Sequence, residues 1–443
     1  MALGVGAIVG TGIYTLIGVG AGLAGPAVIL SFIIAGVVCV CAALAYAELA
    51  CLMPAAGSAY TYTYSVGGEL LAWIVGWSLI LEYSVVCSAV AVGWSGYAVG
   101  FLKAAGGDLP VALLSGAFAG GVINLPAIVI TFVVAGMLIA GTRESATVNS
   151  VLVTVKIIAL LVFIAIGFAA FKSGNFSPFM PYGFESHAQS GDTRGVMAAA
   201  AIIFFAFYGF DAVSTAAEEA RDPGRDVTIG ILGSMVACTV LYMAVAAAAL
   251  GAMPFTEFAK SPEPLAHILR TLGHPVAATA IAAAAVIALP TVILAFMYGQ
   301  SRIFFVMARD GLLPERLGHV NARTGTPVAM TLVTAVVVSV VAGLFPLDEI
   351  ASVANAGTLC AFVAVALCMM TLRVREPTLP RRFRAPLAWL IGPLAVVGCV
   401  YLFVSLKPQT RLYFFVWNGI GIVVYFLFSV RNSALSGRTE RAP

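Results

Sequence analysis

Charged side chains are scarce in this chain. Of its 443 residues, only 10% are Asp, Glu, Lys or Arg, whereas 61% are hydrophobic. A soluble domain of this size keeps a large hydrated surface and has no way to hide so much apolar area. The scarcity of charge therefore excludes a soluble globular protein and indicates that lipid surrounds most of the chain.

Patterns typical of metal, disulfide and catalytic sites are also absent from the sequence. The eight cysteines fall inside or at the ends of apolar runs, and none belongs to a CxxC pair or a Cys/His cluster. We find no phosphate-binding loop and no nucleophile with a base. We therefore interpret the cysteines as packing residues and expect no enzyme activity, metal, cofactor, nucleic-acid partner or obligate protein partner.

The N-terminus lacks the features of a cleaved signal. No basic segment precedes the first apolar stretch, which begins almost directly after Met1, and no small-residue cleavage site leads into a polar domain. We interpret this stretch as the first membrane helix.

Long apolar windows bounded by Gly, Pro and charge predict an all-α polytopic membrane protein with twelve transmembrane helices. Each crossing of ~30 Å of hydrocarbon needs about 20 residues. The predicted spans are 3–24, 26–52, 68–101, 125–141, 145–171, 195–218, 228–252, 275–307, 328–345, 350–373, 386–406 and 412–430.

The distribution of Lys and Arg between the loops predicts the orientation. With a cytoplasmic N-terminus, fifteen of these residues lie inside and seven outside, and one further cation, Lys156, lies within a span. Cytoplasmic loops carry an excess of Lys and Arg. We therefore expect a multi-pass protein of the inner (plasma) membrane with both termini in the cytoplasm.

The spans divide into two sets of five. Residues 1–171 hold helices one to five, and residues 195–373 hold helices six to ten. Helices eleven and twelve follow at 386–430, and 431–443 is expected to be a cytoplasmic tail. Because five is odd, the second set is expected to cross the membrane in the opposite sense, which predicts a 5+5 inverted repeat.

The two predicted halves share features at matching places. Glycines interrupt the first helix of each half, at Gly10 and Gly12 and again at Gly209, and the third helix of each half is unusually long. Interrupted helices at corresponding positions of inverted halves are the best sequence indication of a transporter's binding site. We therefore expect a substrate site where helices one and six are broken.

The first interruption reads GAIVGTGI from Gly6 to Ile13. Glycine destabilises a helix interior by about 1 kcal/mol relative to alanine. Unwinding here would expose backbone N–H groups and the positive end of a half-helix dipole, which suit a carboxylate. The alternative is close helix packing, because small residues spaced by four are common in membrane helices.

The second interruption reads FFAFYGFD from Phe204 to Asp211, with aromatic residues around Gly209 and an acid within the membrane. Carbonyls freed here would accept hydrogen bonds from an ammonium group. Phe205 is a candidate gate over a substrate, and Asp211 is a candidate acidic site. The alternative is ordinary aromatic core packing with Asp211 paired to a neighbour.

Lys156 is the strongest single-residue candidate for a functional role within the membrane. It lies about ten residues into its span, or ~15 Å deep at 1.5 Å per residue. A charge at that depth is costly, and such residues usually face a cavity and have a function. A buried lysine loses its proton more readily, so Lys156 is a candidate proton carrier. The alternative is a permanent ion pair, for example with Glu82, another candidate acidic residue deep in the third span.

Several stretches together resemble the amino acid–polyamine–organocation (APC) superfamily, and within it the bacterial relatives of the cationic amino acid transporters. They are spread over the first eight helices and read GAIVGTGIY (6–14), AGPAVILSF (24–32), YAELACLMPAAGSAYTYTY (46–64), LEYSVVCSAVAVGWSGY (81–97), FFAFYGFDAVSTAAEEARDP (204–223) and MYGQSRIFFVMARDGLLP (297–314). The resemblance implies a LeuT-type fold. Members usually have a cytosolic leader before the first helix, whereas here Met1 lies almost in that helix.

The resemblance also implies roles for individual residues. Backbone amides of Thr11, Gly12 and Ile13 would hold the substrate carboxylate, and carbonyls of Ile8, Phe205 and Tyr208 would hold its ammonium group. Lys156 matches a lysine that replaces the sodium ion of sodium-coupled relatives, which implies proton coupling.

The sequence thus predicts a secondary transporter that imports L-amino acids with protons by alternating access. Two alternatives remain open, namely an exchanger of amino acids or amines without net proton flux and a transporter-like amino acid sensor. The substrate also remains open. The resemblance is to carriers of cationic amino acids, but Phe205, Ala206 and Tyr208 suit a small or medium neutral amino acid at least as well.

Overall fold

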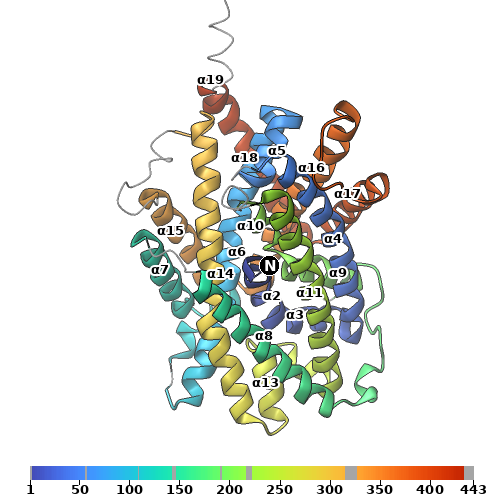
Figure 1. The fold of residues 1–443 in the computed structure, drawn as a ribbon. Coiled ribbons are helices and arrows are strands. Elements are labelled where there is room, and N and C mark those ends of the chain that lie inside the picture. Colours follow the sequence, from blue (N-terminus) through green and yellow to red (C-terminus); the bar gives the residue numbers. More distant parts are fainter. Residues whose placement is uncertain are drawn as a thin grey trace, which may run out of the picture.

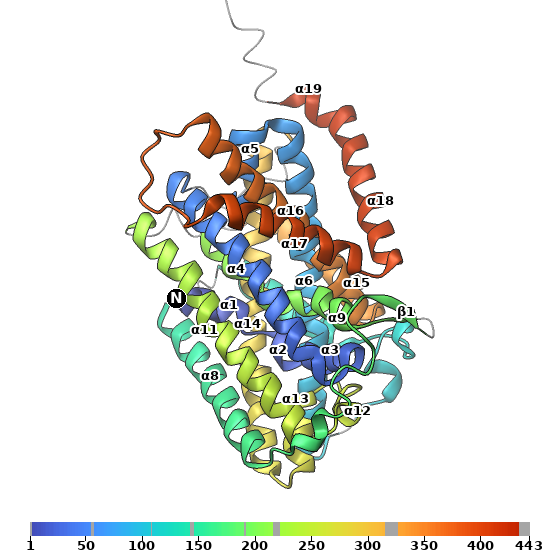
Figure 2. The same cartoon turned by 90° about the vertical axis from the view of Figure 1, so that its right-hand side faces the viewer.

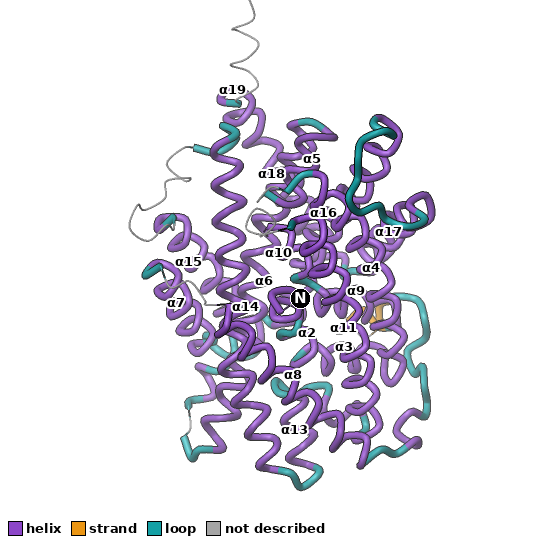
Figure 3. Tube along the Cα trace, viewed as in Figure 1, coloured by secondary structure: helices purple, strands orange, loops and turns teal. Residues whose placement is uncertain are grey.

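The computed structural model describes residues 2–54, 57–107, 109–141, 146–189, 192–215, 222–314 and 327–433. Helices make up nearly all of its regular structure (Figures 1 and 3). Within these residues, eight helices are long and apolar enough to cross a membrane. Three shorter apolar helices accompany them, at Leu125–Ile139, Val196–Phe207 and Val328–Leu344. The chain is therefore an all-α polytopic membrane protein.

The first half of the chain contains one divided helix and several long ones. The elements are α1 (Ala2–Ile8), α2 (Thr11–Tyr14), α3 (Leu16–Ala24), α4 (Val28–Leu52), α5 (Ser58–Gly67), α6 (Glu69–Ala104), α7 (Leu125–Ile139) and α8 (Ala146–Ala169).

The second half contains another divided helix and then mostly continuous ones. The elements are α9 (Val196–Ile203), the 3-10 segment η5 (Phe204–Phe207), α10 (Phe210–Thr215), α11 (Pro223–Ala252), α12 (Phe255–Phe258), α13 (Pro264–Thr271), α14 (Pro275–Arg309), α15 (Val328–Leu344), α16 (Leu347–Arg375), α17 (Ala388–Ser405), α18 (Pro408–Val424), the π-helical turn η8 (Tyr425–Ser429) and α19 (Val430–Asn432).

Some elements were not expected from the sequence. These are α5, α12, α13 and a short antiparallel hairpin of β1 (His187–Gln189) and β2 (Asp192–Arg194), in which His187 pairs with Arg194. All of them are short segments in connections between apolar helices, where hydrophobic length carries no signal. Of the tail expected at 431–443, residues 434–443 lie outside the described residues.

The two longest helices, α6 and α14, pack along each other through the middle of the molecule (Figure 1). Buried polar side chains hold them in register. The Nε2 atom of Gln300 donates to the Oγ atom of Ser84 at 2.7 Å, and the indole N–H of Trp94 donates to the carbonyl of Val286 at 2.8 Å. An unpaired polar group is costly inside a membrane protein, so these bonds favour one alignment of the two helices.

The divided helices lie next to this pair. In both views α1 lies at mid-height in the molecule (Figures 1 and 2). It packs against α8, α10, α11 and α14, and η5 packs against α2 and α4. Both helix interruptions are therefore enclosed by protein, which is where irregular backbone is tolerated at membrane depth.

A buried carboxylate ties α4 to the segment after α16. Glu48 is 1% exposed, and its carboxylate accepts a hydrogen bond from the Nε atom of Arg373 at 3.0 Å and from the backbone N–H of Ala385 at 2.8 Å. Arg381 adds an ion pair at 3.1 Å. Glu48 lies inside the protein, because the chain between α16 and α17 folds back over it.

Replacing this carboxylate should destabilise the protein. Glu48→Gln leaves the Arg373 and Arg381 charges without their buried counter-charge, which costs about 3 kcal/mol or more. We expect a clearly lower melting temperature in detergent. Glu257→Gln, on an exposed side chain, is the matched control and should melt like the wild type. Equal melting temperatures for all three proteins would show that the Glu48 contacts contribute nothing.

Candidate functional site

The first interruption lies between α1 and α2. The α1 helix ends at Ile8, and Gly10 then adopts an extended conformation (φ −143°, ψ −150°) before α2 begins at Thr11. The α2 helix approaches η5 very closely, because a Cβ atom placed on Gly12 would lie 2.3 Å from the Cα atom of Ala206. Only glycine at position 12 permits this contact. The first interruption therefore rests directly on the second.

The second interruption follows η5. Tyr208 is extended (φ −63°, ψ 161°), and Gly209 has φ +103°, a conformation that L-amino acids with a side chain rarely adopt. A Cβ atom on Gly209 would also lie 2.7 Å from the carbonyl carbon of Ala7. Gly209 is therefore required twice, by its backbone conformation and by its contact with α1.

Two buried polar side chains hold the second interruption in place. The Oδ1 atom of Asp211 accepts a hydrogen bond from the N–H of Gly209 at 3.2 Å, and its Oδ2 atom accepts one from the hydroxyl of Tyr83 at 3.1 Å. On the other side, the amide of Asn355 donates to the carbonyls of Ala201 and Ile202. These bonds satisfy backbone groups that no longer have helical partners.

Asn355 also accepts a hydrogen bond from the hydroxyl of Tyr208. It lies on α16 and is completely buried. Through this one side chain, α16 contacts both the end of α9 and the extended residue that follows η5.

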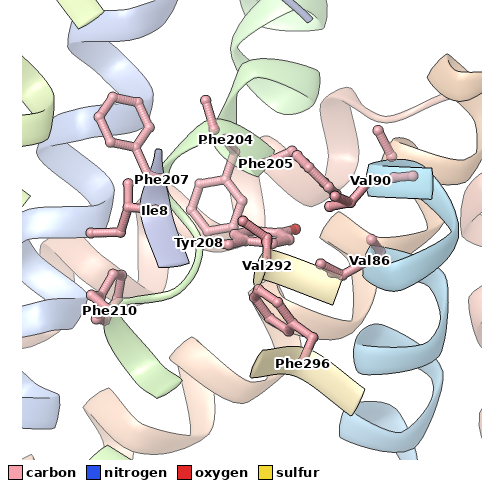
Figure 4. Packing of buried hydrophobic residues seen from close by; sticks show 14 of the residues in the cluster. Ile8, Val86, Val90, Phe204, Phe205, Phe207, Tyr208, Phe210, Val292 and Phe296 are labelled. Carbon is pink, nitrogen blue, oxygen red and sulfur yellow. The ribbon is translucent and has the colours of Figure 1, made fainter. Parts of the chain in front are cut away.

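A small cavity of about 10 Å³ lies where the interruptions meet. Figure 4 shows Val86 and Val90 entering it from α6, Val292 and Phe296 from α14, and Phe205 and Tyr208 from the second interruption. The first interruption contributes Ala7, Ile8, Gly10, Thr11 and Gly12. The volume suits about one water molecule, so any larger ligand requires the lining side chains to move outward.

The cavity brings together five of the residues expected at the site, namely Ile8, Thr11, Gly12, Phe205 and Tyr208. The rings of Phe205 and Tyr208 lie 5.0 Å apart between centroids. Phe205 is 5% exposed, so in this conformation it is packed inside the protein.

Two other expected binding residues, Ile13 and Gly209, do not line the cavity. The N–H of Ile13 donates to the carbonyl of Gly10 at 3.2 Å, and Gly209 packs against the backbone of Ala7. Two of the expected acceptors also have protein donors already. The carbonyl of Ile8 accepts from the hydroxyl of Tyr242 at 2.7 Å, and that of Phe205 accepts from the N–H of Tyr208 at 3.3 Å. A carbonyl has two lone pairs, so each keeps capacity for a ligand.

The hydroxyl of Thr11 is buried without a hydrogen-bond partner among the described residues. Thr11 is 1% exposed and is one of the residues that line the cavity. Its side chain lies against Gly93 of α6. An unpaired buried hydroxyl costs about 1–3 kcal/mol. Because Thr11 belongs to the cavity lining, this hydroxyl is a candidate partner for a polar ligand.

Lys156 lies beside the first interruption but outside the cavity lining. Its side chain is 1% exposed, and its ammonium group donates to the carbonyl of Gly6 at 3.0 Å and to the Oγ1 atom of Thr291 at 3.4 Å. The charge thus lies on the last turn of α1, where a helix C-terminus is negative.

Glu82, the other acid predicted within the membrane, is buried between α6 and α16. A Cβ atom on Gly357 of α16 would lie 3.2 Å from the Cβ atom of Glu82. Its Oε2 atom has no hydrogen-bond partner within the described part of the chain.

Sequence reasoning missed the apolar wall of the cavity and its polar supports. Val86, Val90, Val292 and Phe296 are pairs spaced by four on two long helices. Nothing distinguishes such pairs from other core residues before the helices are packed. Asn355 did carry a signal, because an amide inside an apolar helix must find a partner.

Comparison with known proteins decides the family. The family model described as "Amino acid permease" matches residues 1–429. This chain belongs to the amino acid permease family. The permease is accordingly a member of the APC superfamily, as its sequence motifs indicated.

The names of its relatives refer to several different substrates. The permease is 44% identical to the branched-chain amino acid permease BcaP of Bacillus subtilis over 98% of its own length and 92% of the relative's. It is 40% identical to the methylthioribose transporter of the same bacterium, over 98% and 93%. The vacuolar cationic amino acid transporter 4 of Arabidopsis thaliana is 36% identical, over 85% of this permease and 62% of the relative.

The double requirement at Gly209 can be tested by adding one methyl group. Gly209→Ala places a Cβ atom in a disfavoured backbone region and against α1, which we expect to destabilise the protein by about 1–3 kcal/mol and to lower its melting temperature. Gly136→Ala is the control, since a Cβ atom there meets nothing within 4 Å and alanine favours helix. If Gly209→Ala melts at or above the melting temperature of Gly136→Ala, glycine is not required at position 209.

Proposed function

We propose that this permease imports neutral L-amino acids with aliphatic side chains, coupled to protons, by alternating access around the two interrupted helices. The observation that carries the proposal is the cavity between them. It combines a backbone opening and an unpaired hydroxyl on one side with purely apolar side chains on the other. An amino acid has the same division, with charged groups at its α-carbon and a separate side chain.

The polar side of the cavity suits the charged groups of the substrate. The carboxylate would accept hydrogen bonds from the backbone amides of Thr11 and Gly12 and from the Thr11 hydroxyl. The ammonium group would donate to the remaining lone pairs of the Ile8 and Phe205 carbonyls and to the carbonyl of Tyr208. Binding would thereby satisfy polar groups that otherwise lie buried and incompletely paired.

The apolar side of the cavity supports a neutral side chain. Val86, Val90, Val292 and Phe296 provide no group that could pair with a guanidinium or ammonium. Burying such a charge among them would cost several kcal/mol. The relative named for branched-chain amino acids therefore fits this cavity better than those named for cationic ones. Phe205 would act as the gate that closes over the side chain.

Lys156 supports proton coupling. In the protonated form its ammonium group holds the Gly6 carbonyl and so fixes the end of α1 next to the cavity. Loss of the proton would weaken this contact and free α1 to move. Protonation and the position of the first interrupted helix are linked in this way, and the same helix binds the substrate carboxylate.

The proposal includes the membrane arrangement. The permease would cross the plasma membrane twelve times with both termini in the cytoplasm, and helices one to five would be related to helices six to ten by a LeuT-type inverted repeat. The loop charges support this orientation. The order along the chain of the interrupted helices and of the two longest helices, α6 and α14, supports such a repeat.

Three other activities would use the same cavity. An amino acid exchanger needs no net proton flux, and counterflow measured with and without a pH gradient distinguishes it from a symporter. A methylthioribose carrier is suggested by the second relative. This substrate has neither a carboxylate nor an ammonium group to meet the polar side of the cavity. A transporter-like sensor would bind an amino acid without moving it.

Coupling through Lys156 is tested in proteoliposomes. Lys156→Ala should reduce amino acid accumulation driven by an inward proton gradient at least tenfold, because no group then links protonation to α1. Exchange of internal for external amino acid, measured without a gradient, reports whether the variant still binds and moves substrate. Lys172→Ala, on an exposed side chain, is the control and should accumulate normally. A full response of Lys156→Ala to the pH gradient would remove the coupling role.

The substrate class is tested by thermal stability. A ligand selective for the folded protein raises its melting temperature. Among the twenty amino acids and methylthioribose, we expect Val, Ile, Leu and Ala to stabilise the purified permease and Arg and Lys to leave it unchanged. In Val292→Phe, which fills the apolar side, the shift with Leu should fall more than the shift with Ala. Stabilisation by Arg or methylthioribose alone would contradict the proposed substrate.

A further inference from the structure

A second and much larger cavity lies away from the interrupted helices. It is an open groove of about 800 Å³ between α5, the start of α6 and the last four turns of α16. Along α16 it extends from Cys360 to Arg375, which is about 22 Å at 1.5 Å per residue. One leaflet of a bilayer contributes ~15 Å of hydrocarbon, so the groove is long enough to follow a lipid chain through its leaflet.

The groove changes in polarity from one end to the other. The end of the groove farther from Arg375 is lined by Ile74, Val363 and Leu367. Leu367 is 46% exposed. Its mouth is formed by Gly67, Gly68 and Arg375. The start of α6 and the end of α16 meet at this mouth, where Arg375 donates to the carbonyl of Val66 at 3.1 Å. An apolar channel that ends at an arginine has the same order of groups as a phospholipid.

The mouth of the groove is also positively charged. Residues 373–384 contain five arginines and one glutamate. Glu48 and Asp222 pair with Arg373, Arg381 and Arg382, and still leave a positive balance. Glu69, next to Gly68 in the sequence, accepts hydrogen bonds from the hydroxyls of Tyr425 and Ser433. Its carboxylate lowers the balance to one positive charge among these nine side chains.

We propose that this groove binds an anionic phospholipid, with one acyl chain along α16 and the phosphate on Arg375. The guanidinium group has five N–H donors, so it can hold the Val66 carbonyl and a phosphate together. Basic pockets between membrane helices on the cytoplasmic side are suited to anionic headgroups. Placement in the cytoplasmic leaflet rests on the orientation proposed above, whereas the groove and its chemistry do not depend on the transported substrate.

Native mass spectrometry of the delipidated permease in mild detergent tests this site. We would titrate palmitoyl-oleoyl phosphatidylglycerol and, separately, phosphatidylcholine with the same chains. The wild type should prefer phosphatidylglycerol, and Arg375→Gln should weaken its binding about fivefold and remove most of the preference. Arg384→Gln, which removes the same charge from an exposed arginine outside the groove, should bind within about twofold of the wild type.

A second variant tests the apolar channel. Ala364→Phe fills the groove and should weaken binding of both lipids, whereas Val400→Phe adds the same ring to the exposed face of α17 and should not. Melting temperatures confirm that each variant is folded. Unchanged phosphatidylglycerol binding in Arg375→Gln or Ala364→Phe would overturn the proposal. A second result would also overturn it. If the wild type is a dimer, and Ala364→Phe alone converts it to a monomer without loss of lipid binding, then the groove holds a second copy of the chain.

Discussion

The need to satisfy backbone polar groups within the membrane governs the centre of this protein. Two helices stop and restart at mid-height, which leaves carbonyls without helical partners where no bulk water reaches. Side chains from other helices supply the missing donors. Lys156 donates to the carbonyl of Gly6, Tyr242 to that of Ile8, and Asn355 to those of Ala201 and Ile202. These four hydrogen bonds are explained by this one constraint.

The same constraint links structure to transport. Because the partners of the interrupted helices come from α8, α11 and α16, a movement of any of these helices changes which backbone groups are paired. A substrate that offers a carboxylate and an ammonium group can replace pairing lost in such a movement. Under the proposed coupling, a proton on Lys156 would change the strength of one pairing directly. In this scheme, substrate and proton act on the same backbone segment, and coupling needs no long path between separate sites.

The sequence allowed the class of the protein and the places of the interruptions to be predicted well. Glycines at 10, 12 and 209 and a lysine at 156 within apolar spans are unusual enough to be recognised without a structure. Val86, Val90 and Val292 were not predicted, because valine is common throughout the apolar helices. The pairing of Glu48 with Arg373 and Arg381 was not predicted either, because these residues lie far apart in the chain.

Hydrophobic length and glycine content are local properties, so the sequence by itself determined that the chain lies in lipid and that its helices break at Gly10 and Gly209. Which residues contact one another depends instead on how the helices pack. Only the tertiary structure decided that Gly12 lies against Ala206, that Lys156 contacts the Gly6 carbonyl, and that the cavity wall is apolar. These contacts join residues from helices far apart in the chain, and helix packing alone brings them together.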